Sequence, residues 1–555
     1  MKNRIKQYLL AASMCVGLTA CSDFFEPIPG VQFGLDETFA SKQRTEEYLN
    51  NVYSYVREVT DAIHPNTYGG IFTEASLDGA NRWNKTYAEW TNGSFNSASA
   101  QASEYFSKYY QAIAKASTFI QNVDKCTEAA ASTRGKWKSE ARALRAYYYF
   151  ELLRLYGPIP LIGEDPIPLD ASLEELIKER NSVDECVNFI ATELQSAIDS
   201  GDLLQRAGKA NLGRMDVATC MALKAKLYLY WASPLFNGNT DQASVKNKDG
   251  KQLFPQTEDN SKWTQARDAY ERFMTFATGQ GYKLTEVYTN GKLDPYASCR
   301  AAGEFFTTTW EAVDELIFVK LRDLYDYTYW VCPKFTDFQD TDVTGGGGYY
   351  TTQETVDLFF TKDGLTIEED PGYDKFEGIP GANNFTSGRY YDPNNPSRLY
   401  FDADKSKVLK QWKDREPRFY VNITYSGSIW LNEGKYNEEM RTDFTNGANG
   451  TCGKSKASGD CPDSGYLIRR GAKASNNNGS KHFSPVLRLA DMYLGYAEAL
   501  CMCSDLDNAL TYLNKIRVRA GIPEYTFTAT AGKITCPKTQ TDLLNRIRRE
   551  RLVEL

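Results

Sequence analysis

Two stretches of the sequence combine aromatic rings with short polar and planar side chains. They span residues 68–95 and 322–330. A ring face can pack against apolar C–H groups while amides, hydroxyls and guanidinium groups form hydrogen bonds, so this mixture suits a flat, hydroxylated ligand such as a sugar. The candidate ligand-binding residues are Asn81, Arg82, Trp83, Tyr87, Trp90, Tyr325, Tyr327, Tyr329 and Trp330.

Core packing is the alternative role for each of these rings, because aromatic residues make up 13% of the chain. Polar and glycine neighbours favour exposure of Trp83 and Trp90. If the second stretch is extended, Tyr327 and Tyr329 share one face and could stack together on one ligand. Trp310 and Trp430 are weaker candidates.

The residue patterns that catalysis commonly uses are scarce. The chain has two histidines, His64 and His482, and no HExxH or GxSxG motif. A Cys/His zinc site has little support without a CxxC pair, and the acidic run 368–370 lacks the spacing of an EF-hand calcium loop. We therefore expect no catalytic residue, metal or cofactor. A glycoside hydrolase stays as an alternative, because its two carboxylates need only lie close in space.

Composition and net charge indicate which classes of molecule the protein is suited to bind. The 555 residues are 42% apolar and 25% charged, which is typical of a globular protein that buries a large core. Lys and Arg number 64 against 72 acidic residues, a net charge of −8, and no long basic run attracts a phosphate backbone. The sequence therefore argues against nucleic acid as a partner.

The first residues are typical of an export signal. Lys2, Arg4 and Lys6 precede a short apolar run that ends in Leu18–Cys21. This ending resembles a bacterial lipobox, which predicts a signal peptide over residues 1–20 and lipid attachment at Cys21. An ordinary cleaved signal with an incidental cysteine is the alternative. Acyl chains on Cys21 would hold a soluble body at a membrane surface without a spanning helix.

The ten cysteines other than Cys15 and Cys21 are too scattered for the disulfide framework of a small secreted fold. We expect most of them to be buried thiols. Cys452 and Cys461 flank a Gly/Ser/Lys-rich loop and could pair.

Helical periodicity dominates about 36–280 and returns over 485–555, whereas short apolar runs and turn clusters fill about 281–484. Small residues at the expected crossings predict a mainly α fold of tetratricopeptide-like helix pairs, with a loop-rich, small-strand middle that binds the ligand. We expect the early and late pairs to meet in space. The predicted helices span 103–123, 136–156, 183–198, 214–232, 263–276, 486–502 and 506–520. The apolar runs Leu316–Val319 and Phe419–Ile423 predict short strands.

Buried charges on these helices must be paired. Arg142 and Arg145 with Glu140 lie on an otherwise aromatic helix, and we expect them to join neighbouring helices through ion pairs. Asp491 and Glu498 in the late helix have the same expected role.

Several segments, in this order behind the lipobox, resemble the SusD/RagB family of nutrient-binding outer-membrane lipoproteins of Bacteroidetes. The resemblance covers nearly the whole chain. The segments that carry it are Glu140–Phe150, Leu155–Leu161, Thr361–Gly364, Asp414–Phe419, Leu487–Ala499 and Ile547–Arg551. It implies a SusD-like fold over residues 21–555 and a glycan site on an aromatic arc of early and middle loops, without transferring individual positions.

The same resemblance implies a function and a partner. Such a protein captures oligosaccharide or polysaccharide at the cell outer membrane and delivers it to a SusC-like TonB-dependent transporter. Acidic residues after Cys21 resemble the surface-export signal of these lipoproteins, which predicts a body facing the exterior. A binder of peptides or other nutrients with the same fold is the runner-up. Family members usually continue beyond the segment at Ile547–Arg551, so we expect a C-terminal truncation at Leu555 or an unusually short last helix.

Overall fold

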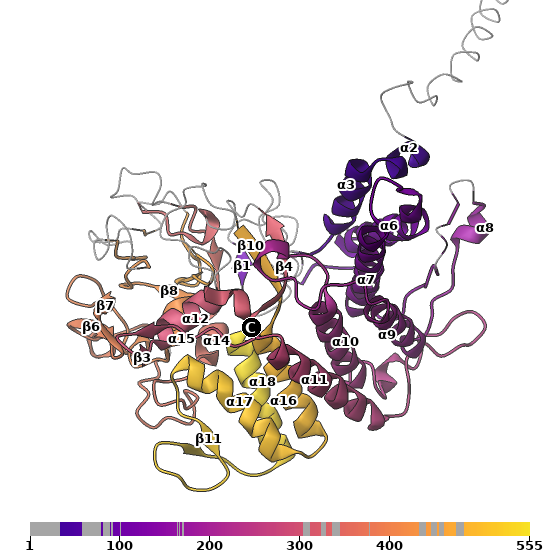
Figure 1. The fold of residues 1–555 in the computed structure, drawn as a ribbon. Helices are drawn as coiled ribbons and strands as arrows, with labels where there is room; N and C mark the ends of the chain where they lie inside the picture. Colours follow the sequence, from indigo (N-terminus) through magenta and orange to yellow (C-terminus); the bar gives the residue numbers. More distant parts are fainter. Residues whose placement is uncertain are drawn as a thin grey trace, which may run out of the picture.

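The computed structural model describes residues 34–57, 79–81, 89, 93–99, 101–163, 165, 167–168, 171–303, 311–322, 329–335, 345–376, 378–431, 440–445, 452–453, 460–472 and 482–555. Helices dominate and strands are short, so the fold is mainly α, as the sequence predicts. Figure 1 shows the early helices stacked on one side, the late helices α16–α18 below the centre, and the middle of the chain on the other side.

The early helices form a stack of neighbouring pairs. They are α2 (Leu35–Ala40), α3 (Lys42–Tyr53), α6 (Gln101–Asn122), α7 (Ala131–Tyr156), α8 (Leu173–Leu176), α9 (Val183–Asp199), α10 (Val217–Ala232) and α11 (Ser261–Gly279). Helix α9 begins in a capping box, in which Ser182 Oγ accepts from the Glu185 amide and Glu185 Oε2 accepts from the Ser182 amide. Asp216 caps α10 by accepting from the Thr219 amide at 2.7 Å, which starts that helix three residues after the predicted position.

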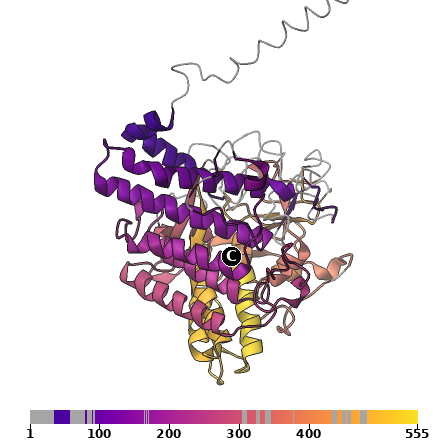
Figure 2. The same ribbon diagram turned by 90° about the vertical axis from the view of Figure 1, so that its right-hand side faces the viewer.

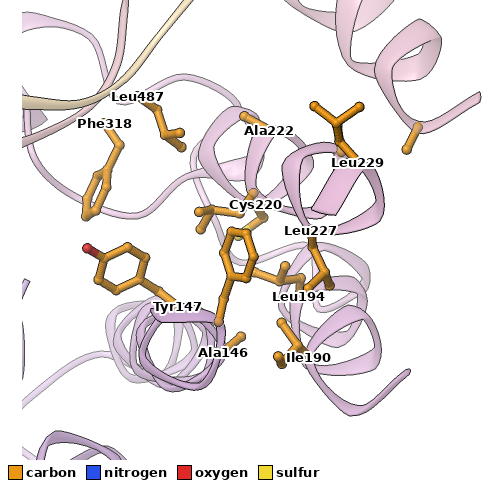
Figure 3. Packing of buried hydrophobic residues seen from close by; sticks show 14 of the residues in the cluster. Ala146, Tyr147, Ile190, Leu194, Cys220, Ala222, Leu227, Leu229, Phe318 and Leu487 are labelled. Atoms are coloured by element: carbon orange, nitrogen blue, oxygen red, sulfur yellow. The ribbon is translucent and has the colours of Figure 1, made fainter. Parts of the chain in front are cut away.

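The core of this stack lies between α7, α9 and α10 (Figure 3). Tyr147 of α7 points toward Phe318, with ring centroids 5.9 Å apart at 73°. Ile190 and Leu194 of α9 are buried against the same core. Burying each large apolar side chain contributes about 1.5–3 kcal/mol, so the helix pairs are held chiefly by their shared apolar faces.

The late helices are α16 (Leu489–Met502), α17 (Leu506–Ala520) and α18 (Gln540–Glu554). Figure 2 shows them beside the early stack. The rings of Tyr270 on α11 and Tyr496 on α16 stack with centroids 6.3 Å apart. Gly495 permits this approach, because a Cβ there would lie 2.3 Å from the Tyr270 hydroxyl. The predicted meeting of early and late helices is confirmed.

The remaining elements are short. The helices are α12 (Pro295–Gly303), α14 (Gln353–Leu358) and α15 (Pro417–Asn422). The strands are β1 (Ala80–Asn81), β2 (Tyr288–Thr289), β3 (Lys292–Leu293), β4 (Leu316–Arg322), β5 (Tyr349–Tyr350), β6 (Arg389–Asp392), β7 (Asn395–Asp402), β8 (Ile423–Tyr425), β9 (Tyr466–Ile468), β10 (His482–Arg488), β11 (Tyr525–Thr526) and β12 (Ile534–Thr535). One sheet has four strands in the order β1-β5-β9-β8, and β4 pairs with β10 antiparallel.

Two further sequence predictions differ from the structure in detail. The apolar run at 419–423 is mostly helix α15 rather than strand. Pro417 occupies the first turn of α15, where its fixed φ favours helix initiation and its missing N–H costs nothing. Helix α16 begins at Leu489 rather than Val486, because residues 482–488 pair with β4 as strand β10.

The charged residues of the aromatic helix α7 are paired as expected. Arg142 Nη1 lies 2.9 Å from Glu193 Oε1, and Arg145 Nε donates to Glu193 Oε2 at 2.8 Å. Glu140 Oε2 lies 2.8 Å from Arg214 Nη2. These pairs join α7 to α9 and to the segment before α10, which confirms their predicted structural role.

Asp491 and Glu498 have the same role in α16. Asp491 Oδ2 lies 2.5 Å from Lys226 Nζ of α10, and its Oδ1 lies 3.1 Å from Arg551 Nη2 of α18. Glu498 Oε1 lies 3.5 Å from Arg548 Nε of α18. Burial alone would raise the pKa of Asp491, but Lys226 and Arg551 hold it well below its usual range.

A larger network of ion pairs, here called the buried network, connects the late helices to the middle of the chain. Its members are Glu315, Glu416, Arg418, Arg488, Arg517, Arg519, Glu550 and Glu554, all at least nine-tenths buried. Arg488 Nη1 lies 2.9 Å from Glu315 Oε1 and 3.1 Å from Glu554 Oε1. Arg519 pairs with the same two carboxylates.

Arg418 extends the buried network from α15 to α18. Its Nε lies 2.7 Å from Glu416 Oε2, and its Nη2 lies 2.6 Å from Glu550 Oε1. Glu550 Oε2 also lies 3.2 Å from Arg517 Nη1. A buried charge without a partner costs several kcal/mol, so the members of this network have to be present together.

Removing one carboxylate of the buried network should destabilise the protein strongly. We predict that Glu550→Ala lowers the free energy of unfolding by about 3–5 kcal/mol, because Arg418 and Arg517 then lose a buried partner. The matched control Asp507→Ala breaks an exposed pair with Lys538 and should cost at most about 1 kcal/mol. Urea denaturation measures both values, and equal losses would contradict the assignment.

The Asp491 ion pairs predict a pH dependence of stability. Because the folded pKa of Asp491 is depressed, its stabilising contribution is fully present above about pH 4, the unfolded pKa, and is lost as the pH falls through the folded pKa. Asp491→Asn should therefore be less stable than the parent at pH 7, with a gap that narrows below about pH 4. Urea denaturation at pH 7, 4 and 3 measures the gap, and a gap that widens on acidification would refute this assignment.

Candidate functional site

The four-stranded sheet brings together parts of the chain that are far apart in sequence. Strand β1 pairs antiparallel with β5, with Asn81 opposite Tyr349 and Ala80 opposite Tyr350. Strand β5 in turn pairs with β9 through Tyr350 and Leu467. Residues 80–81 of the first candidate stretch thus lie against β5, which ends the glycine-rich segment 345–350.

The same glycine-rich segment, residues 345–350, forms backbone hydrogen bonds with the end of the second candidate stretch. Residues 329–331 form a helical turn. The Gly346 amide donates to Tyr329 O at 2.8 Å, and the Gly348 amide donates to Trp330 O at 3.2 Å. Residues 80–81 of the first candidate stretch and 329–330 of the second therefore both contact residues 345–350.

Tyr329 and Trp330 are half-buried, and their rings meet edge to face with centroids 4.8 Å apart. Trp330 packs on a small apolar core, here called the Trp430 cluster. The cluster consists of Val331, Cys332, Phe335, Tyr349, Trp430, Leu431, Met440, Cys452 and Ala472. This support fixes one side of the Trp330 ring and leaves part of it accessible.

Gly345 and Gly346 are required by this packing. A Cβ on Gly346 would lie 2.3 Å from Trp330 Cε3, and one on Gly345 would lie 2.3 Å from Tyr329 O. The glycine run 345–348 in the sequence indicates a turn, but its main role is to let the backbone pass directly over these two residues.

The structure describes some of the predicted ligand-binding residues and not others. Asn81 is placed by its backbone in β1, and Tyr329 lies in a helical turn, so the condition under which Tyr327 and Tyr329 would share a strand face is not met at Tyr329. Trp430 is 1% exposed and belongs to the core, so the structure does not support it as a binding residue. The predictions that lie outside the described residues are Cys21, Arg82, Trp83, Tyr87, Trp90, Trp310, Tyr325 and Tyr327.

A pocket that the sequence did not indicate lies between α14, the 3₁₀ turn Lys410–Trp412 and β9. Its volume is about 570 Å³, within the range of about 300–1,000 Å³ usual for small-molecule sites. It is lined by Gln353, Asp357, Lys375, Phe376, Gly378, Pro380, Leu409, Gln411, Trp412, Ser426, Phe444, Thr445, Ser464, Gly465 and Tyr466. These residues are spread over more than 100 positions of the sequence, so no local motif indicated the pocket.

Hydrogen bonds in series fix the polar wall of this pocket. Trp412 Nε1 donates to the Tyr466 hydroxyl at 3.0 Å, and that hydroxyl donates to Gln353 Oε1 at 2.8 Å. Gln353 Nε2 then donates to Asp357 Oδ1 at 2.8 Å. Burial raises the pKa of Tyr466 to about 12, which keeps its hydroxyl protonated as a donor at neutral pH.

Other site chemistries find little support in the described part of the chain. Among those residues, no group of three or more His, Cys, Asp and Glu side chains could hold a metal ion. The acidic run Glu368–Asp370 lies in a loop, where Glu369 Oε1 lies 3.0 Å from Arg546 Nη2. No described helix is long and apolar enough to span a membrane.

Comparisons with family models match both ends of the chain. Residues 315–555 match the model of the SusD family, and residues 32–229 match a model described as starch-binding associating with outer membrane. The two matched ranges include the early stack as far as residue 229 of α10, the late helices and the residues of the buried network.

Individual proteins are similar to this chain in sequence or in fold. A SusD-like protein of Bacteroides ovatus is 27% identical over 175 residues, so the alignment covers 30% of this chain and 30% of that protein. The solved structure of BT4246 has a TM-score of 0.73 at 24% identity, covering 93% of this chain and 87% of that one. A SusD-like carbohydrate-binding protein from Bacteroides fragilis has a TM-score of 0.61 at 18% identity, with 93% and 84% covered. These structures share the fold of this chain.

The close contact between Gly346 and Trp330 yields a prediction. We expect Gly346→Ala to destabilise the protein by about 1–3 kcal/mol and to shift tryptophan fluorescence, because the new methyl group must displace the indole ring. Gly279→Ala is the control, since a Cβ there meets nothing within 4 Å. Thermal denaturation and emission spectra that do not distinguish the two variants would refute the packing described here.

Proposed function

Because the chain belongs to the SusD family, we propose that it is a lipoprotein that captures oligosaccharide or polysaccharide at the outer membrane and delivers it to a SusC-like TonB-dependent transporter. The observation that carries the proposal is the match of residues 32–229 to a model described as starch-binding associating with outer membrane. The solved Bacteroides fragilis relative, named as a carbohydrate-binding protein, agrees with a carbohydrate ligand.

The proposed glycan surface is formed by the two aromatic stretches. Strand pairing of β1 with β5 and the contacts of residues 345–348 with Tyr329 and Trp330 support one continuous surface. Partly exposed rings there would pack against the C–H faces of sugars. The proposed ligand-binding residues remain Asn81, Arg82, Trp83, Tyr87, Trp90, Tyr325, Tyr327, Tyr329 and Trp330.

The proposed anchoring follows from the N-terminal sequence. Residues 1–20 would be removed as a signal peptide, and Cys21 would carry the lipid. The body 21–555 would then be held at the membrane by acyl chains and face the exterior. Tethering to one membrane raises the effective concentration of transporter and binding protein for each other, so a modest contact between them suffices.

A non-catalytic role agrees with the family descriptions and with the sequence, in which common catalytic motifs are absent. Release of reducing sugar by the purified chain would support the glycoside hydrolase alternative. Binding of peptides in preference to sugars would support the other alternative, a nutrient binder of the same fold.

Affinity electrophoresis through polysaccharide gels tests the proposed glycan surface. We predict that the chain is retarded by at least one plant, host or microbial polysaccharide without release of reducing sugar. Trp83→Ala or Trp90→Ala should weaken the binding by about 1–3 kcal/mol, by analogy with stacking on other flat ligands. Tyr288→Ala is the matched control, because Tyr288 is an exposed ring on the separate β2–β3 hairpin. Unchanged retardation of both tryptophan variants would remove residues 68–95 from the site.

A further inference from the structure

We propose that the pocket between α14, residues 410–412 and β9 is a second binding site, which takes one uncharged pyranose unit as a monosaccharide or the end of a disaccharide. None of the described lining residues belongs to the aromatic stretches 68–95 or 322–330. The inference therefore goes beyond the proposed glycan surface and does not depend on it.

The unused hydrogen-bonding groups of Gln411 are the first support. Gln411 is 6% exposed and lines the pocket. Its backbone oxygen accepts from Tyr373 and Arg415, but its side-chain amide forms no hydrogen bond with any described residue. Because Gln411 lines the pocket, a ligand hydroxyl there could both donate to and accept from this amide.

The fixed polar wall is the second support. In the series from Trp412 to Asp357, the single hydrogens of Trp412 Nε1 and the Tyr466 hydroxyl are used, and Gln353 Nε2 uses one of its two, so these bonds orient the groups before a ligand arrives. Gln353 Nε2 donates to Asp357 Oδ1, and no described residue donates to Asp357 Oδ2. A free carboxylate oxygen is a strong acceptor for a sugar hydroxyl.

The apolar groups of the pocket suit the faces of a sugar ring. Trp412 and Tyr466 are buried and meet edge to face with ring centroids 5.9 Å apart. Phe376 and Phe444 are partly exposed and line the same space. Aromatic walls with a few oriented polar groups are the usual composition of a small-molecule site.

The charged residues and the volume of the pocket further restrict the class of ligand. The described lining residues include one carboxylate, Asp357, and one ammonium group, Lys375, so their formal charges balance. The volume of about 570 Å³ exceeds one sugar ring and leaves room for a second ring or for water. The hydroxyls of an uncharged pyranose would form hydrogen bonds with the Asp357 carboxylate and the Gln411 amide, and its C–H faces would pack against the aromatic rings.

Titration calorimetry of the full chain with glucose, galactose, mannose, xylose, N-acetylglucosamine and disaccharides of these sugars tests the proposal. We expect at least one probe to bind with a Kd of about 1 mM or tighter. Gln411→Leu should weaken that binding about tenfold or more, because it keeps the volume and removes the hydrogen bonds. Gln205→Leu, an exposed glutamine outside the pocket, should bind as the parent does.

Asp357→Asn is a second variant that should leave the fold intact, because the asparagine oxygen still accepts a hydrogen bond from Gln353 although the negative charge is removed. It should also weaken sugar binding about tenfold, at an unchanged melting temperature. Trp83→Ala and Trp90→Ala should leave this binding unchanged, which separates the pocket from the proposed glycan surface. The proposal is overturned if no sugar binds, if glycine or alanine binds in place of sugars, or if both pocket variants bind as tightly as the parent.

Discussion

The structure depends on the pairing of buried charges. Four arginines and four glutamates lie out of contact with water where α15, α17, α18 and the ends of β4 and β10 meet. A charge moved from water into such a region is tolerated only when an opposite charge and hydrogen bonds replace its hydration. The middle of the chain must therefore dock on the late helices in one arrangement, in which every guanidinium reaches a carboxylate.

This constraint positions the candidate binding region. Arg488 ends β10 and is fixed by Glu315 and Glu554, and β10 in turn fixes the register of β4. The chain leaves β4 at Arg322 for the second aromatic stretch, whose end is held by the glycine run 345–348. The early stack contributes the first stretch through β1. A rigid helical frame thus holds the ends of loops that can differ in sequence without disturbing the core.

Much of the fold could be predicted, because helical periodicity is a local signal. Helix α17 matches its predicted bounds, and α6, α7, α9 and α11 match theirs to within five residues. Helix α15 was not predicted because the five-residue run Phe419–Ile423 fits a strand or a helix equally well, and Pro417, which favours helix initiation, lies before that run. The need to pair Arg142 and Arg145 was evident from sequence, but their partner Glu193 was not, since that choice depends on how α7 packs against α9. The pocket at Gln411 and Trp412 could not be predicted, because only tertiary contacts bring its walls together.

Hydrogen–deuterium exchange of the chain with and without a retarding polysaccharide tests whether the two aromatic stretches form one glycan surface at the four-stranded sheet. We expect the glycan to slow exchange in residues 79–95 and 329–350 together, while the helices of the early stack exchange as before. Protection confined to other segments, with both of these unchanged, would contradict it.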